Sequence, residues 1–106
     1  MAKFLWKASY TSDGVKGVLK EGGTGRRATI DALVEGLGGK VEAFYFALGE
    51  HDVYVIADLP DTVTATAVSL TVNASGAVAL QTVELLTPEE VDEASKKSVD
   101  YRPPGA

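Results

Sequence analysis

The 106-residue chain contains no cysteine and only one histidine. Without cysteine it cannot form disulfide bonds, use a thiolate nucleophile or hold cysteine-ligated zinc or iron–sulfur centres. With one histidine, a single subunit cannot build a multi-histidine metal site. We therefore expect neither a metal ion nor a cofactor.

Basic residues are also scarce, because 10 Lys and Arg stand against 15 Asp and Glu and the net charge is −5. Nucleic-acid phosphates are bound by clustered Lys and Arg, so we expect no nucleic-acid partner. No apolar run approaches the roughly 20 residues of a membrane helix. Residues 1–7 begin like a strand and lack the long apolar region of a signal peptide. The sequence predicts a cytoplasmic protein with no membrane partner.

Two apolar runs between residues 40 and 59 are rich in β-branched and aromatic side chains. The polar, glycine-led break Gly49-Glu50-His51-Asp52 separates them, which predicts a β-hairpin. Because strand side chains alternate between faces, both faces of this hairpin are apolar. One face of the first strand would carry Val41, Ala43, Tyr45 and Ala47, and the other Phe44, Phe46 and Leu48. An exposed apolar face is unusual for a monomer, so we expect a second copy to cover it.

The remaining segments alternate between strand and helix patterns. Apolar residues at every second position predict strands over 2–10, with Phe4, Trp6, Ala8 and Tyr10 on one face, and over 77–86. Helical spacing predicts a helix over 26–37, and the glycine-rich run 22–25 predicts a break before it. Residues 61–75 fit a helix or, through their threonines and valines, a strand. We predict a helix there because start and stop signals flank the segment.

The C-terminal part begins with Thr87-Pro88-Glu89-Glu90, which has an N-cap, a proline at the first helical position and a capping glutamate. This pattern predicts a final helix, followed by an extended tail over 99–106. We interpret residues 1–106 as a single domain with an ordered core over 2–98. The fold class is α+β, a ferredoxin-like βαββαβ arrangement with a four-stranded antiparallel sheet and a C-terminal helix.

Short motifs along nearly the whole chain have a specific order and spacing. They are Gly14-Val15-Lys16-Gly17, Gly38-Gly39, Phe44-Tyr45-Phe46, Gly49-Glu50-His51-Asp52, Leu59-Pro60-Asp61, Asn73-Ala74-Ser75-Gly76 and the segment 97–104. Together they resemble the GYD-domain family, named for a Gly, Tyr, Asp motif. Gly49 and Asp52 match that motif, whereas His51 stands where the family has tyrosine.

The resemblance implies membership of the dimeric α/β-barrel superfamily, whose ferredoxin-like subunits pair their sheets into a barrel. It therefore implies a homodimer or higher homo-oligomer assembled through the sheet face. The superfamily includes small monooxygenases, haem-handling enzymes and ligand-sensing domains. The GYD family itself has no established activity that can be carried over, because a shared fold does not fix function.

Two groups of residues on the predicted hairpin and first strand are candidates for chemistry or binding. His51 beside Asp52 could act as a general acid or base. The alternative is structural: Gly49 supplies the turn and Asp52 bonds its backbone. Trp6, Tyr45 and Tyr54 are candidates for lining an apolar pocket between sheet and helices. Aromatic residues on strands also serve as core or dimer interface, so that alternative stays open.

A third candidate is an anion site at Thr24, Arg26 and Arg27. Free backbone N–H groups at a helix start, with two guanidinium groups, suit a phosphate or carboxylate. The alternative is a loop with solvated or interface arginines.

The scarcity of chemical groups favours binding over catalysis. Our hypothesis is an uncharacterised GYD-domain protein that acts as a homo-oligomeric module binding or sensing a small molecule. One alternative is a cofactor-independent monooxygenase-like enzyme that uses His51 and a pocket tyrosine. Another alternative is a purely structural assembly domain.

Overall fold

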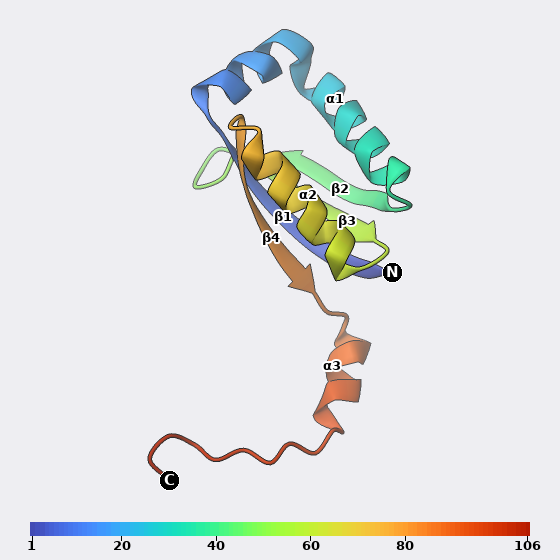
Figure 1. The fold of residues 1–106 in the computed structure, drawn as a ribbon. Helices are drawn as coiled ribbons and strands as arrows, with labels where there is room; N and C mark the ends of the chain where they lie inside the picture. The colour runs from blue at the N-terminus through green and yellow to red at the C-terminus, as the bar shows by residue number, and fades with distance from the viewer.

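The computed structural model describes residues 1–106 and consists of a four-stranded antiparallel sheet with helices on one face (Figure 1). The strands are β1 (Ala2–Tyr10), β2 (Lys40–Phe46), β3 (Val53–Leu59) and β4 (Val78–Leu85), and the helices are α1 (Ser12–Gly36), α2 (Thr62–Ala74) and α3 (Pro88–Ser95). The strand order is β2-β3-β1-β4. This arrangement confirms the predicted α+β ferredoxin-like fold, and the ambiguous segment 61–75 is helical.

Helix α1 consists of two helical halves joined at Gly22. The backbone there has φ 80°, in the left-handed region that glycine adopts without a steric penalty. The glycine-rich run therefore breaks the helix, as the sequence predicts. Figure 1 shows that the half after the break descends over β2, while α2 lies over the rest of the same face, with most of its contacts to β4 at the opposite edge.

The covered face of the sheet, which lies under α1 and α2, carries the hydrophobic core. Buried side chains alternate along the two central strands, so that each contributes every second residue to this face. The core residues are Phe4, Trp6, Ala8, Val34, Phe44, Val53, Val55, Ala57, Leu59, Ala65, Val68 and Val78. The predicted strand with Phe4, Trp6, Ala8 and Tyr10 on one face is thus confirmed, and the first three of these side chains are buried.

A register shift between Val41 and Ala43 changes the predicted faces of β2. Val41 pairs with Ala57 and packs partly against the core, whereas Ala43 pairs with Ile56. Strict alternation places Val41 and Ala43 on one face, and that prediction was wrong. A β-bulge inserts one extra residue and sends the side chains before it to the opposite face.

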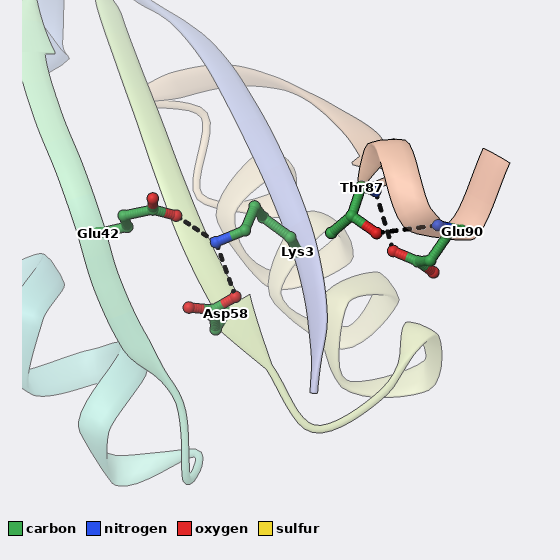
Figure 2. A network of polar contacts seen from close by, with 5 residues as sticks. All are labelled: Lys3, Glu42, Asp58, Thr87 and Glu90. Carbon is green, nitrogen blue, oxygen red and sulfur yellow. Dashed lines mark hydrogen bonds and ion pairs between the residues drawn. The ribbon is translucent and has the colours of Figure 1, made fainter. Parts of the chain in front are cut away.

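The open face is the other side of the sheet, which neither α1 nor α2 covers. Its centre is a row of apolar residues in cross-strand register: Ala43, Ile56, Leu5 and Val83. At one end of this face, Lys3 forms ion pairs with Glu42 and Asp58, the latter at 3.1 Å (Figure 2). Hydrogen bonds to Glu42 and Asp58 raise the pKa of Lys3. The open face is thus apolar at its centre and charged at this end.

The C-terminal arm, residues 87–106, projects away from the sheet (Figure 1). Its helix starts with the predicted capping box: the Glu90 N–H donates to Thr87 Oγ1 at 3.1 Å, and the Thr87 N–H to Glu90 Oε1 at 3.0 Å (Figure 2). Every residue of the arm is exposed. The radius of gyration is 16.9 Å, against about 13 Å for a compact chain of this length.

Candidate functional site

A cavity of about 50 Å³ lies between the covered face and the two helices. Twelve of its 13 lining residues are hydrophobic, and they come from the sheet and from both helices. They include Trp6, Phe44, Val55, Ile30, Leu33 and Val72. The one charged residue in the lining is Arg26. Close packing leaves few voids larger than a water in protein interiors, so an apolar cavity of this kind is a candidate binding site.

Trp6, which lines this cavity, carries a buried polar group without a partner. The side chain is only 4% exposed, yet its indole Nε1 makes no hydrogen bond. Its cross-strand neighbour Thr82 has an unpartnered buried hydroxyl as well, although Thr82 does not line the cavity. Leaving a buried donor unsatisfied costs about 1–3 kcal/mol. A ligand or water with an acceptor atom would remove that penalty at Trp6.

A groove of about 450 Å³ adjoins the cavity beside the first half of α1. Tyr10, Arg26, Val72 and Val78 line both the cavity and the groove, and therefore mark where the two meet. The groove is more polar than the cavity, because Asp13, Glu21 and Ser75 also line it.

Gly14 in α1 and Gly39 just before β2 each lie close to the backbone of another segment. A Cβ on Gly14, which lines the groove, would lie 2.1 Å from the backbone oxygen of Ala77. A Cβ on Gly39 would lie 2.2 Å from the backbone oxygen of Asp58. Only glycine permits such close backbone approach.

Tyr10 and Arg26 are the polar side chains at the junction of cavity and groove. Burial raises the pKa of the Tyr10 phenol, and the nearby positive charge of Arg26 opposes that rise. The phenol therefore stays protonated at neutral pH and can donate a hydrogen bond. The sequence placed Tyr10 on the buried face of its strand, but no motif singled it out as a site residue.

The three residues predicted as an anion site are separated in the structure. Arg26 is half-buried and lines the cavity, whereas Thr24 and Arg27 are exposed. Arg27 pairs with Asp31 at 3.7 Å along the same helix. Arg26 takes part in none of the three ion pairs of the chain. Of this set, only Arg26 reaches the cavity.

His51 lies away from the cavity, at the end of the open face. Its Nδ1 and the Ser9 hydroxyl share a hydrogen bond of 3.2 Å, and its ring meets that of Tyr54 edge-on, with centroids 5.9 Å apart. No pattern in the sequence indicated Ser9 as a partner of His51. The contact depends on the β1–β3 register, which no local motif reveals.

Asp52 does not pair with His51 but holds the β2–β3 loop against β1. Its carboxylate accepts the Tyr10 backbone N–H at 2.8 Å, and its own N–H donates to the Ala8 carbonyl at 2.8 Å. Its carbonyl accepts from Ala47 at 2.8 Å. These bonds fit the structural interpretation of the motif, although Asp52 bonds β1 as well as the turn. Gly49 lies exposed in the same loop.

Tyr45 and Tyr54 face each other across β2 and β3 on the open face. Tyr45 is 72% exposed, and neither tyrosine lines the cavity. Among the three predicted pocket aromatics, only Trp6 lines it.

One comparison with known protein families covers almost the whole chain. The family model of the GYD domain matches residues 4–95, from β1 to the end of α3. No curated protein and no solved structure matches the chain. None of the helices has the length and apolar character needed to cross a membrane. The match includes the cavity, the open face and the loop with Gly49 and Asp52, and the chain therefore belongs to the GYD-domain family.

Proposed function

We propose that this protein is a homo-oligomeric module that binds a small, mainly apolar molecule in the cavity and does not catalyse a reaction on it. The observation that carries the proposal is the apolar cavity with an unpartnered Trp6 indole N–H in its lining. Such a combination of apolar walls and few polar groups is typical of small-molecule sites.

The size of the cavity limits the ligand. The cavity measures about 50 Å³, and holding a single water takes roughly 10–15 Å³ of probe-occupied volume. It therefore has room for a small group but not for a large ring system or a long chain. The adjoining groove accommodates any further part of the ligand.

The side chains around the cavity argue for binding without catalysis. Its titratable groups are Tyr10, whose raised pKa keeps it protonated, and the permanently charged Arg26. Neither is a general base at neutral pH. His51, which is the chain's one histidine, lies at the open face with Ser9 and Tyr54.

The open face supports the homo-oligomeric part of the proposal. Its apolar row includes Leu5, Ile56 and Val83, and the exposed ring of Tyr45 lies beside it. Pairing two copies through this face would remove the row from water. The charges around Lys3 would then lie at the rim, where interfaces are commonly polar.

The binding proposal is tested by ¹H–¹⁵N NMR titration of the whole chain with isobutanol and benzyl alcohol at millimolar concentration. We expect saturable shifts at the amides of Ala8, Val55 and Val68. Val72→Phe places a larger side chain in the cavity and should abolish the shifts. Val63→Phe, at an exposed position of the same helix, should keep them.

Absence of saturable shifts in the unaltered chain would overturn the binding proposal. If that chain still forms oligomers, the result favours the assembly-domain alternative. Turnover of a bound probe in the presence of oxygen would instead favour the monooxygenase-like alternative.

A further inference from the structure

Arg26 is a charged side chain at the edge of an apolar cavity, beside Tyr10, and it forms no ion pair. It is half-buried, lines the apolar cavity and makes none of the chain's ion pairs. A buried or half-buried charge is normally paired, because desolvation without compensation is unfavourable. Arg27, the next residue, is exposed and pairs with Asp31, so the contrast is specific to position 26.

The position of Arg26 suits one end of an amphipathic ligand. Arg26 and Tyr10 both line the junction of cavity and groove, so a molecule with its apolar part in the cavity would place its other end beside them. A guanidinium group presents several N–H donors in a planar fork that matches a carboxylate. The protonated Tyr10 hydroxyl is a further donor at the same place.

We propose, as a refinement that rests on the binding function above, that the ligand is a small monocarboxylate with a short branched alkyl tail. The tail fills the cavity between the sheet and the helices. The carboxylate pairs with Arg26 at the cavity mouth. The tail must be short because the cavity is small, at about 50 Å³.

Acidic side chains in the groove restrict the ligand to one negative charge. Asp13 and Glu21 line the same groove as Arg26. A second carboxylate or a phosphate extending into that groove would meet like charges, which repel it. The site therefore selects monocarboxylates against dicarboxylates of similar size.

The test compares isovalerate with isovaleramide, which has nearly the same shape but no charge, by NMR titration of the full chain. We expect isovalerate to bind about tenfold more tightly, which corresponds to 1.4 kcal/mol. 3-Methylglutarate carries a second carboxylate at the end of the tail, which would enter the apolar cavity, so it should bind more weakly than isovalerate. Arg26→Gln should remove the preference for the carboxylate while isovaleramide still binds. Arg27→Gln is the matched control and should keep the preference.

The outcomes separate this inference from the function on which it rests. Equal affinity of the unaltered chain for isovalerate and isovaleramide overturns the monocarboxylate assignment and leaves ligand binding intact. Isovalerate binding that is unaffected by Arg26→Gln overturns the role of Arg26. If the acid, the amide and the neutral alcohols all fail to shift any amide, the binding function itself is overturned.

Discussion

The two faces of one sheet differ in what they leave unsatisfied. The covered face is closed by α1 and α2, and it leaves a cavity with an unpartnered donor and an unpaired cation. The open face leaves an apolar row with the charges of Lys3 on one side and the polar side chains of Lys7, Ser9 and His51 on the other. Successive residues of β1 contribute to the covered face and to the open face in turn, because side chains alternate along a strand. One short segment can therefore serve ligand binding on one side and self-association on the other.

The largest expected effect is a difference in unfolding free energy between truncations on the covered face and on the open face. Phe4 is 1% exposed, so Phe4→Ala should lower the free energy of unfolding by about 3–5 kcal/mol. Leu5→Ala, one residue along but on the open face, should lower it much less. Urea denaturation at low protein concentration, where association contributes least, measures both. Equal losses would contradict the energetic difference between the faces.

The next prediction addresses association. Ile56→Glu places a charge in the centre of the open face and should convert an oligomer into single chains, as measured by light scattering. Val91→Glu, on the exposed helix α3, is the control and should leave the mass unchanged. A mass of one chain for the unaltered protein at micromolar concentration would refute pairing through the sheet.

A smaller effect concerns the charged end of the open face. The pKa of Lys3 is raised in the folded state, so its stabilising effect is complete below the unfolded pKa, near 10.5. That effect is lost as the pH rises through the higher folded pKa. The melting temperature should therefore fall less steeply in alkaline solution for Lys3→Met than for the unaltered chain. Parallel curves would show that the Lys3 pairs are energetically neutral, as exposed pairs often are.

The smallest expected effect concerns the C-terminal arm, which belongs to neither face. All of its residues are exposed, so ending the chain at Leu86 should change the unfolding free energy by no more than about 0.5 kcal/mol. Thermal unfolding at low concentration measures this change. Fewer chains per oligomer after truncation, with unchanged stability, would show that the arm contributes to the interface between copies.

Much of the fold followed from local patterns in the sequence. Alternating apolar residues predicted the first strand, and Gly22 marked the helix break. Asp61 resolved the ambiguous segment as a helix start: its carboxylate accepts the Thr64 N–H at 2.7 Å, which lowers the pKa of Asp61. These features depend on neighbours a few residues apart, which a sequence displays directly.

The site was only partly predictable, because it depends on register and on what covers each face. Trp6 and Arg26 were singled out and line the cavity. Tyr45 and Tyr54 were singled out as well, but the helices cover the face that carries Phe44 and Val55 instead. Both hairpin faces are apolar, so composition could not decide between them. No pattern in the sequence indicated the bulge before Ala43.

The loop that carries Gly49 and Asp52 has a thermodynamic consequence. Asp52 bonds the backbone of Tyr10, whose ring borders the cavity, while His51 bonds Ser9, whose side chain belongs to the open face. The two proposed binding events thus share adjacent residues at the end of β1. By linkage, any factor by which a ligand changes the affinity between copies is also the factor by which association changes ligand affinity. Measuring ligand affinity at several protein concentrations would therefore give the coupling free energy between ligand binding and association.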